Sequence, residues 1–336
     1  MEKFPFERET TETITIKESE TDLEMASNPE KESIKQLINY GIININKPQG
    51  PTSHQTTDYV KKILNIKRAG HSGTLDPNVT GSLIIALGDA TRIVHHLLKA
   101  GKEYVCLMHL HKQANKNNIT QAINSFVTVI DQLPPVRSAV KRRKRKKEIY
   151  YIKIIEINDQ EVLFKVGCEA GTYIRKLCHD IGIKLKTGAH MQQLVRTRVG
   201  PFNESTMHSL YELKDAYELY KQGNETELRK ILQPIETAIE HLPKVWITDH
   251  SVDPVAHGAD LAIPGIAKLN DKIKEKDTVA VLTLKGELVC TGTSKLTSEE
   301  IVKRDKGIAV KTQKVFIQRN VYPKYEKWVI LQIRKF

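Results

Sequence analysis

A polar turn over residues 70–81 places one carboxylate, Asp76, where it could do chemistry. The turn reads Gly-His-Ser-Gly-Thr-Leu-Asp-Pro-Asn-Val-Thr-Gly, and its glycines and Pro77 restrict the path of the backbone. The apolar run at 83–87 predicts a buried strand that would anchor the turn. An aspartate held in this way is suited to nucleophilic attack on a substrate.

Two other interpretations of the turn come from its residues. An aspartate before a proline often caps backbone N–H groups in a turn, and spacing alone does not exclude that role for Asp76. The run Gly70-His-Ser-Gly73 begins like a serine hydrolase elbow, but that motif needs a glycine where this chain has Thr74. The serine hydrolase interpretation therefore fails, and the aspartate keeps both a capping and a chemical interpretation.

Length and charge limit the classes of protein to consider. A chain of 336 residues predicts two domains, and a net charge of +12 favours a polyanionic partner, first of all a nucleic acid. Residues 1–33 hold ten acidic and four basic side chains, so the remainder carries about +18. Four widely spaced cysteines without a C-x-x-C pair argue against a zinc ribbon or a disulfide framework. Without an apolar run of about 18 residues, we expect a soluble intracellular protein that does not bind membranes.

The order of predicted elements indicates an α+β protein. After the acidic N-terminal extension at 1–33, a larger domain at 34–243 includes a helix from Ser53, as its N-cap, through Leu64, and a hairpin over 149–168. Short apolar strands and glycine-containing turns at 244–336 predict a small β-barrel.

Two histidines, His109 and His111, would share one face of a predicted strand. Two imidazoles on one face can bind a metal ion, but the sequence offers no third ligand near them. We therefore expect no metal site.

A run of seven cations, Lys141 to Lys147, lies between Pro134-Pro135 and the predicted hairpin. A solvated loop or a nuclear localisation signal would explain such a run, but its place inside a folded domain favours contact with an RNA backbone. Each phosphate contact would steepen the logarithmic salt dependence of binding by roughly 0.7 to 0.9.

Three segments together resemble the signatures of pseudouridine synthases of the TruB and dyskerin type. They are His71-Ser-Gly-Thr-Leu-Asp-Pro77 with Thr80-Gly81, then Gly101-Lys-Glu-Tyr104, and then Cys168-Glu-Ala-Gly-Thr-Tyr-Ile-Arg175. The resemblance implies that Asp76 is the catalytic nucleophile and that Arg175 pairs with it. It also implies that Tyr104 stacks on the target base and takes part in proton removal. Leu194, in the matching segment 188–196, and His71 are implied to contact substrate, and His71 helps to fill the stack that the extruded nucleotide leaves.

The implied chemistry is consistent with these residue types. A neighbouring guanidinium favours the ionised carboxylate, which is the competent nucleophile. Pseudouridine formation cleaves a C–N glycosidic bond, turns the freed uracil and rejoins it through carbon, with no metal, nucleotide or redox cofactor. The sequence leaves open whether the aspartate attacks ribose C1′ or uracil C6.

Two further segments resemble RNA-binding parts of dyskerin-type enzymes. The run 133–141 is similar to the start of their thumb loop, which clamps substrate RNA; it places the thumb at about 134–150 and implies substrate contacts by Lys141, Arg142, Arg143 and Lys144. The segments 242–248, 257–265 and 307–310 resemble the PUA domain, which grips the lower stem and ACA end of a guide RNA and packs against the N-terminal extension. The implied guide-binding residues are His257, Gly258, Ala259, Asp260 and Gly265.

The resemblance covers roughly residues 35–325 and implies an archaeal dyskerin-like catalytic subunit of box H/ACA ribonucleoproteins. It implies a mixed-sheet catalytic domain followed by a PUA domain. The expected reaction converts uridine to pseudouridine in rRNA, with tRNA as a second substrate class, at positions that a box H/ACA guide RNA selects. Expected protein partners are a zinc-ribbon-like protein and a kink-turn-binding protein, in the cytoplasm of an archaeal cell or the nucleolus of a eukaryote. The alternatives are a stand-alone synthase acting on the tRNA T-loop and a non-catalytic RNA-binding scaffold.

Overall fold

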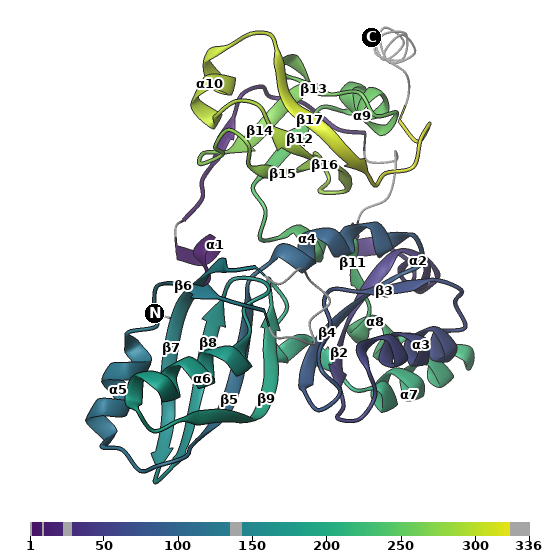
Figure 1. The fold of residues 1–336 in the computed structure, drawn as a ribbon. Helices are drawn as coiled ribbons and strands as arrows, with labels where there is room; N and C mark the ends of the chain where they lie inside the picture. Colours follow the sequence, from purple (N-terminus) through teal and green to yellow (C-terminus); the bar gives the residue numbers. More distant parts are fainter. Residues whose placement is uncertain (1, 9, 23–28, 135–142, 323–336) are drawn as a thin grey trace, which may run out of the picture. The chain divides into compact units, whose positions relative to one another are not determined.

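The structure is a computed structural model that describes residues 2–8, 10–22, 29–134 and 143–322 (Figure 1). The chain divides into two compact units, one of residues 1–9 and 42–233 and the other of residues 10–41 and 234–336. Both contain mixed sheets and helices, so the α+β class expected from the sequence is confirmed. In the described residues, no helix is long and apolar enough to cross a membrane.

The first unit is built on one mixed sheet, in which the described strands follow the order β10-β2-β4-β9-β5-β8-β7-β6, with β3 beside β4 and β11 beside β2. Two contacts in this sheet, β2 with β10 and β4 with β9, are parallel. The strands are β2 (Gly41–Lys47), β3 (Ala69–His71), β4 (Thr80–Leu87), β5 (Lys102–Leu110), β6 (Val129–Gln132), β7 (Arg145–Asn158), β8 (Glu161–Cys168), β9 (Ala189–Val199), β10 (Met207–His208) and β11 (Gln233–Pro234).

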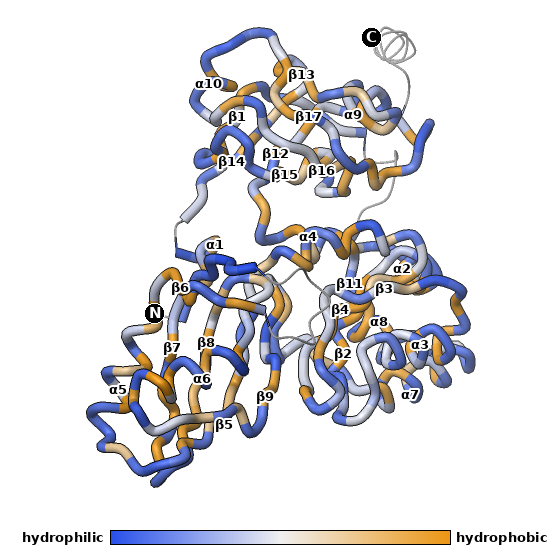
Figure 2. Tube along the Cα trace, viewed as in Figure 1, coloured by the Kyte–Doolittle hydropathy of each residue, from blue (hydrophilic) through white to orange (hydrophobic). Residues whose placement is uncertain are grey.

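The helices of the first unit cover apolar strands. β4 is buried from Gly81 to Leu87, as the run at 83–87 predicts, and Figure 2 shows this hydrophobic stretch. The helices are α1 (Pro5–Arg8), α3 (Ser53–Leu64), η2 (Gly88–Ile93), α4 (Val94–Lys99), α5 (Lys116–Asn124), α6 (Ile174–Leu185), η3 (Glu204–Thr206), α7 (Leu210–Lys221) and α8 (Thr226–Ile231). Leu177, Cys178 and Ile181 turn one face of α6 into the core that also buries Cys106 on β5. This packing holds the body of α6 against β5.

Two local predictions require correction. The N-cap of α3 is Thr52, whose hydroxyl accepts a hydrogen bond from the Gln55 N–H at 3.1 Å, and not Ser53. The basic run is not a continuous loop, because its last three residues, 145–147, lie in β7 and pair with β6. Both adjacent hydroxyls at 52 and 53 suit an N-cap, and only the contacts of Ser53 elsewhere in the fold distinguish them.

The second unit holds a sheet of the order β1-β14-β12-β15-β16-β17-β13 in its described part. Its elements are β1 (Thr13–Thr15), η1 (Pro29–Lys31), α2 (Ile34–Tyr40), η4 (Ile235–Ile239), β12 (Lys244–Ile247), α9 (Asp249–Ala256), β13 (Leu261–Ala262), η5 (Ile263–Gly265), β14 (Ile266–Asn270), β15 (Thr278–Thr283), β16 (Leu288–Ser294), α10 (Ser298–Lys303) and β17 (Ile308–Val315). β1 pairs antiparallel with β14, and the Asp22 N–H donates to the Asp249 carboxylate at 2.9 Å. The described residues 10–22 are thus hydrogen-bonded into this unit, while the domain boundaries at 33 and 243 stay predictions.

Candidate active site

The turn that carries Asp76 is tied to the sheet by its backbone. β3 pairs antiparallel with β4, and just after β3 the Ser72 N–H donates to the Ile84 carbonyl at 2.9 Å. Within the turn, the Val79 N–H donates to the Asp76 carbonyl at 3.0 Å. The aspartate therefore sits in a closed turn whose two ends are sheet residues.

Ser53 restrains the residue before the aspartate. Its hydroxyl accepts a hydrogen bond from the Leu75 N–H at 2.9 Å and donates to the Leu75 carbonyl at 3.3 Å. Both side chains are buried, so water does not compete for these groups. The first turn of α3 thereby fixes the backbone immediately before Asp76.

Lys47, at the end of β2, holds the other side of the turn. Its side chain is fully buried, and Nζ donates to the carbonyls of Pro48 at 2.9 Å, Pro77 at 3.1 Å and Val79 at 2.9 Å. Burial lowers the pKa of Lys47, and the Arg196 guanidinium acts in the same direction while Asp76 opposes them. The three carbonyls satisfy all three N–H donors of the ammonium group, so the lysine acts as a cross-link under the turn.

Arg196, on β9, is a second buried cation beneath the turn and is 2% exposed. Its Nε donates to the Ser82 carbonyl at 2.7 Å and a terminal nitrogen donates to the Gly73 carbonyl at 3.3 Å. β9 approaches so closely that a Cβ on Gly81 would lie 2.2 Å from the Arg196 carbonyl oxygen. Only glycine fits there, and its φ of +101° is also one that favours glycine.

Tyr104, on β5, lies opposite Arg196 in the sheet. Burial raises the pKa of the Tyr104 phenol, while the charge of Arg196 and its hydrogen bond to the phenol oppose that shift. The same guanidinium thus contacts both the aspartate turn and the tyrosine. Sequence reasoning assigned no role to Arg196 or Lys47, because the burial of a charged side chain is not visible in its residue type.

Arg175, the second residue of α6, forms an ion pair with Asp76. Both side chains are more than half exposed, at 59% and 58%, so the pair contributes at most about 1 kcal/mol to stability. Its value is geometric, because the guanidinium fixes the direction of the carboxylate. The structure brings together the two residues that the resemblance paired.

Known protein families and relatives match almost the whole chain. A model described as TruB family pseudouridylate synthase (N terminal domain) matches residues 61–174, and a tRNA pseudouridylate synthase B C-terminal domain matches 175–240. A PUA domain matches 243–316 and a DKCLD domain matches 1–57. A Pyrococcus furiosus protein named probable tRNA pseudouridine synthase B is 53% identical over 93% of this chain and 92% of its own length. The chain belongs to the TruB family of pseudouridine synthases.

Relatives and solved structures place it among the archaeal members of this family. A Methanopyrus kandleri protein of the same name is 50% identical over 96% of this chain and 95% of its own. The fold matches a Cbf5-Nop10-Gar1 complex with a TM-score of 0.91 at 52% identity, covering 94% of this chain and 97% of that one. It matches an H/ACA RNP bound to a substrate RNA containing 2′-deoxyuridine with a TM-score of 0.90 at 49% identity, covering 96% and 99%. The dyskerin-like TruB-type resemblance is confirmed, and with it an RNA isomerase.

The two remaining signature residues of this TruB-family site lie in different surroundings. Leu194 faces Cys106 across the β5–β9 pair and packs, partly buried, against the cluster that includes Ile174. His71 ends β3, and its ring meets that of His54 edge-on at 4.8 Å. Burial lowers the pKa of His71, and His54 adds to that effect, so the imidazole is neutral at pH 7. Their roles toward substrate stay predictions.

The segment of this TruB-family chain that is predicted to form the thumb is described only in part. Arg143 and Lys144 are exposed and directly precede β7, whereas Lys141 and Arg142 lie outside the described residues. Lys147 does not face solvent freely, because its Nζ donates to the Glu169 carboxylate at 2.7 Å. The basic run therefore divides into exposed cations available to RNA and a cation used inside the fold.

The proposed guide-binding residues of the PUA domain form an exposed turn after α9, residues 257–260. The Asp260 carboxylate accepts from the Thr312 N–H at 2.9 Å, which ties the turn to β17. Gly265 is buried, and a Cβ there would lie 2.5 Å from the Ser251 hydroxyl oxygen. Gly265 thus has a packing role in the structure, while the exposed turn is the part that could meet RNA.

In the structure a third histidine, His190, lies beside His109 and His111. The ring centroids of His109 and His111 lie 5.3 and 5.2 Å from that of His190 on β9, and His109 hydrogen-bonds Glu161 at 2.7 Å. Sequence spacing could not show His190, because it reaches the cluster through strand pairing. Across the described ranges, no group of three His, Cys, Asp or Glu side chains is placed to hold a metal ion.

Proposed function

We propose that this pseudouridine synthase acts on uridines that a box H/ACA guide RNA selects, with Asp76 as the nucleophile. The observation that carries the proposal is the ion pair of Asp76 with Arg175 on a turn cross-linked by Ser53, Lys47 and Arg196. A carboxylate so restrained loses little freedom when it attacks, which is the condition for efficient nucleophilic catalysis. Ribosomal RNA is the proposed main substrate, with tRNA as a second class.

The reaction is an isomerisation, so its atoms balance without a co-reactant. The bond from ribose C1′ to uracil N1 breaks and a bond from C1′ to uracil C5 forms; the C5 proton is removed and N1 is protonated. Asp76 adds to C1′ or to C6 and is released at the end. Arg175 stabilises the carboxylate before it attacks and again when it is released. The target nucleotide must leave the helix stack to reach it, and His71 would occupy part of the space it leaves.

Tyr104 is proposed to stack on the extruded uracil. Because burial raises the pKa of its phenol, the hydroxyl stays protonated at neutral pH. Proton removal from C5 would therefore pass through the hydroxyl as a relay, or need a transient phenolate stabilised by Arg196. Leu194 would supply an apolar wall beside the base.

We further propose a ribonucleoprotein setting in the cytoplasm of an archaeal cell. The matched structures are a complex of a related chain with Nop10 and Gar1 and an H/ACA RNP bound to a substrate RNA. By the same arrangement, this chain would bind a zinc-ribbon-like protein and, through the guide RNA, a kink-turn-binding protein. The exposed turn 257–260 of the PUA domain is the proposed contact for the guide RNA, and Arg143 and Lys144 for the substrate.

A second candidate is a guide-independent tRNA synthase, which the names of the curated relatives favour. The test uses the chain assembled with a box H/ACA guide RNA and small partner proteins. Conversion of a matched uridine that disappears when the guide is mismatched supports the proposal. Conversion of a tRNA T-loop uridine at the same rate with and without guide supports the second candidate instead.

Asp76→Asn separates catalysis from RNA binding. The amide has nearly the same shape but cannot act as a carboxylate nucleophile, so we expect conversion to fall by at least about 10⁴-fold while the RNA dissociation constant changes less than about threefold. Primer extension after carbodiimide treatment maps the pseudouridine and measures the conversion directly. A variant that still converts uridine at a tenth of the normal rate would refute the nucleophile assignment.

A further inference from the structure

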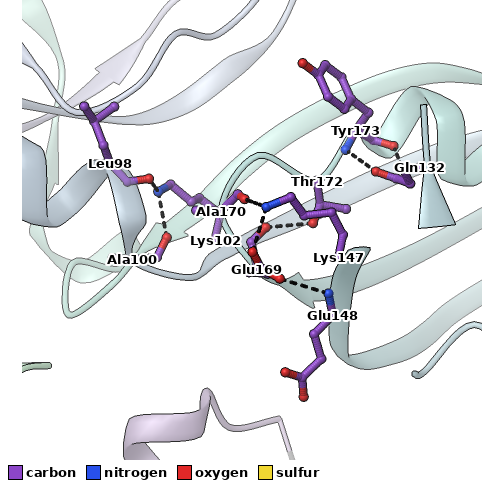
Figure 3. Close-up of polar contacts among 10 residues, drawn as sticks. All are labelled: Leu98, Ala100, Lys102, Gln132, Lys147, Glu148, Glu169, Ala170, Thr172 and Tyr173. Atoms are coloured by element: carbon purple, nitrogen blue, oxygen red, sulfur yellow. Dashed lines mark hydrogen bonds and ion pairs between the residues drawn. The ribbon is translucent and has the colours of Figure 1, made fainter. Parts of the chain in front are cut away.

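A buried glutamine at the base of the thumb pairs with the residue that starts the α6 helix. Gln132, the last residue of β6, is 1% exposed. Its Oε1 accepts from the Tyr173 N–H at 2.9 Å and its Nε2 donates to the Tyr173 carbonyl at 3.2 Å (Figure 3). The side-chain amide thus binds Tyr173 as a neighbouring strand would. Tyr173 is the N-cap of α6 and has no side-chain cap of its own.

Residues of β7 bind the start of the turn that leads into α6, at Glu169 and Ala170. The Lys147 ammonium donates to the Glu169 carboxylate at 2.7 Å and to the Ala170 carbonyl at 2.6 Å (Figure 3). The Glu148 N–H donates to the other Glu169 oxygen at 3.2 Å, and the Glu169 N–H donates to the Glu148 carbonyl at 2.9 Å. Together with Gln132, these contacts hold both ends of the turn 169–173 against the β6–β7 pair.

The β6–β7 pair lies between the exposed cations Arg143 and Lys144 and the turn that leads to Arg175. At one end of the turn, Tyr173 is two residues before Arg175, which meets Asp76. In the β6–β7 pair, Gln132 lies opposite Arg145, which directly follows the exposed Arg143 and Lys144. The β6–β7 pair, which directly follows the exposed cations in the chain at β7, therefore also holds the first turn of α6.

We propose that Gln132 is a positioning residue for the reaction: it sets Arg175 against Asp76 through Tyr173. This inference rests on the proposed function and adds a residue that none of the three signature segments contains. The ion pair is exposed and is not held by packing, so its geometry depends on where the backbone of α6 begins. Misplacement of a catalytic group by about 1 Å can cost on the order of 100-fold in rate.

The first test compares Gln132→Met with Gln160→Met in the assembled guide-RNA complex. Methionine has similar length but cannot replace either hydrogen bond. Gln160 is the matched control, because its Nε2 also donates to a backbone carbonyl, Leu110, at 2.8 Å, at the far end of the same sheet. Under single-turnover conditions with saturating substrate, we expect Gln132→Met to lower the rate about 10- to 100-fold. Substrate affinity should change less than about twofold, and Gln160→Met should leave both quantities within that range.

A double-mutant cycle distinguishes positioning from general stabilisation. If Gln132 acts through Arg175, Gln132→Met should cost less than about twofold in an Arg175→Lys background, because the guanidinium that it positions is absent. Losses that multiply in the double variant would overturn the proposal. An inactive wild-type complex would instead refute the proposed function, so the two failures are distinguishable.

Gln132→Glu supplies a second readout if the methionine variant does not fold. An ionised glutamate accepts from the Tyr173 N–H but repels the Tyr173 carbonyl, whereas a protonated one can donate to that carbonyl and restore both hydrogen bonds. We expect the rate of this variant, relative to wild type, to rise at least fivefold as pH falls from about 8 to 5.5, with circular dichroism showing folded protein throughout. A ratio that stays constant over this range would overturn the positioning role.

Discussion

Asp76 and Arg175 meet as exposed side chains, so neither is placed by its own burial. What holds the aspartate is the set of buried polar groups around its backbone. Ser53, Lys47 and Arg196 each bind carbonyl or N–H groups of the turn. At the scale of single residues, the position of an exposed carboxylate depends on charged and polar groups that water does not reach.

Lys47→Met tests this dependence. Methionine fills similar space but leaves the carbonyls of Pro77 and Val79 without the ammonium donor, at a cost of about 1–3 kcal/mol for each buried polar group left unpaired. We expect a lower free energy of unfolding in urea and a conversion rate reduced by more than tenfold, with RNA affinity nearly unchanged. The exposed Lys62→Met on α3 is the matched control, and equal effects of both variants would contradict the cross-linking role.

At the scale of elements, the end of α4 and the start of β5 share one buried cation, Lys102. Its Nζ donates to the carbonyls of Leu97 at 2.8 Å, Leu98 at 2.9 Å and Ala100 at 2.6 Å, part of which Figure 3 shows. These include carbonyls that the end of a helix leaves without partners. Burial lowers the pKa of Lys102 to about 7. The strand that carries Tyr104 is therefore joined to α4 by a lysine that titrates near neutrality.

This lowered pKa predicts how stability depends on pH. Between pH 7 and 10.5 the unfolded chain keeps the Lys102 proton and the folded chain does not, so this group makes stability rise with pH across that window. We expect the free energy of unfolding of wild type, minus that of Lys102→Met, to increase with pH by up to about 1.4 kcal/mol for each pH unit. Urea unfolding at pH 6, 7.5 and 9 measures it, and a difference that stays constant would contradict the lowered pKa.

At the scale of the whole molecule, the positive charge is the basis for RNA binding. The chain carries +12 overall although residues 1–33 are acidic, and the described strand β1 places part of that acidic segment in the PUA-containing unit. The cations nearest the thumb, Arg143 and Lys144, are exposed. Charge-driven binding of this kind weakens as the salt concentration rises, because releasing counterions into a more concentrated solution gains less free energy.

Replacing Arg143 and Lys144 with glutamine should reduce that salt dependence. If each contacts one phosphate, the slope of log affinity against log salt should become shallower by about 1.4 to 1.8. Fluorescence anisotropy with a labelled substrate RNA between 50 and 300 mM salt, values chosen to span roughly the physiological range, measures the slope. Glutamines at Arg229 and Lys230, whose side chains pair with Glu225 and Glu227 on the same helix region, form the control, and an equal change there would contradict a specific thumb contact.

Much of the fold could be predicted locally. The α3 helix ends at Leu64 as predicted, although its N-cap is Thr52 and not Ser53. The hairpin of β7 and β8 follows from alternating apolar residues around a polar turn. The strand β7 begins earlier than predicted because Arg145 to Lys147 pair with β6, and a run of cations gives no local sign of strand pairing. Local patterns therefore located elements well and their ends less well.

The sequence by itself determined the residue types proposed for the chemistry, the restrained turn around Asp76 and the family resemblance, because these depend on residues adjacent in the chain. The resemblance also paired Arg175 with Asp76, but only the tertiary structure decided which other residues meet: Ser53 with Leu75, His190 with His111, and Gln132 with Tyr173. It also decided that Lys47, Lys102 and Arg196 are buried. Such contacts join residues far apart in the chain, and a charged side chain becomes a buried cross-link only where the fold surrounds it with backbone carbonyls.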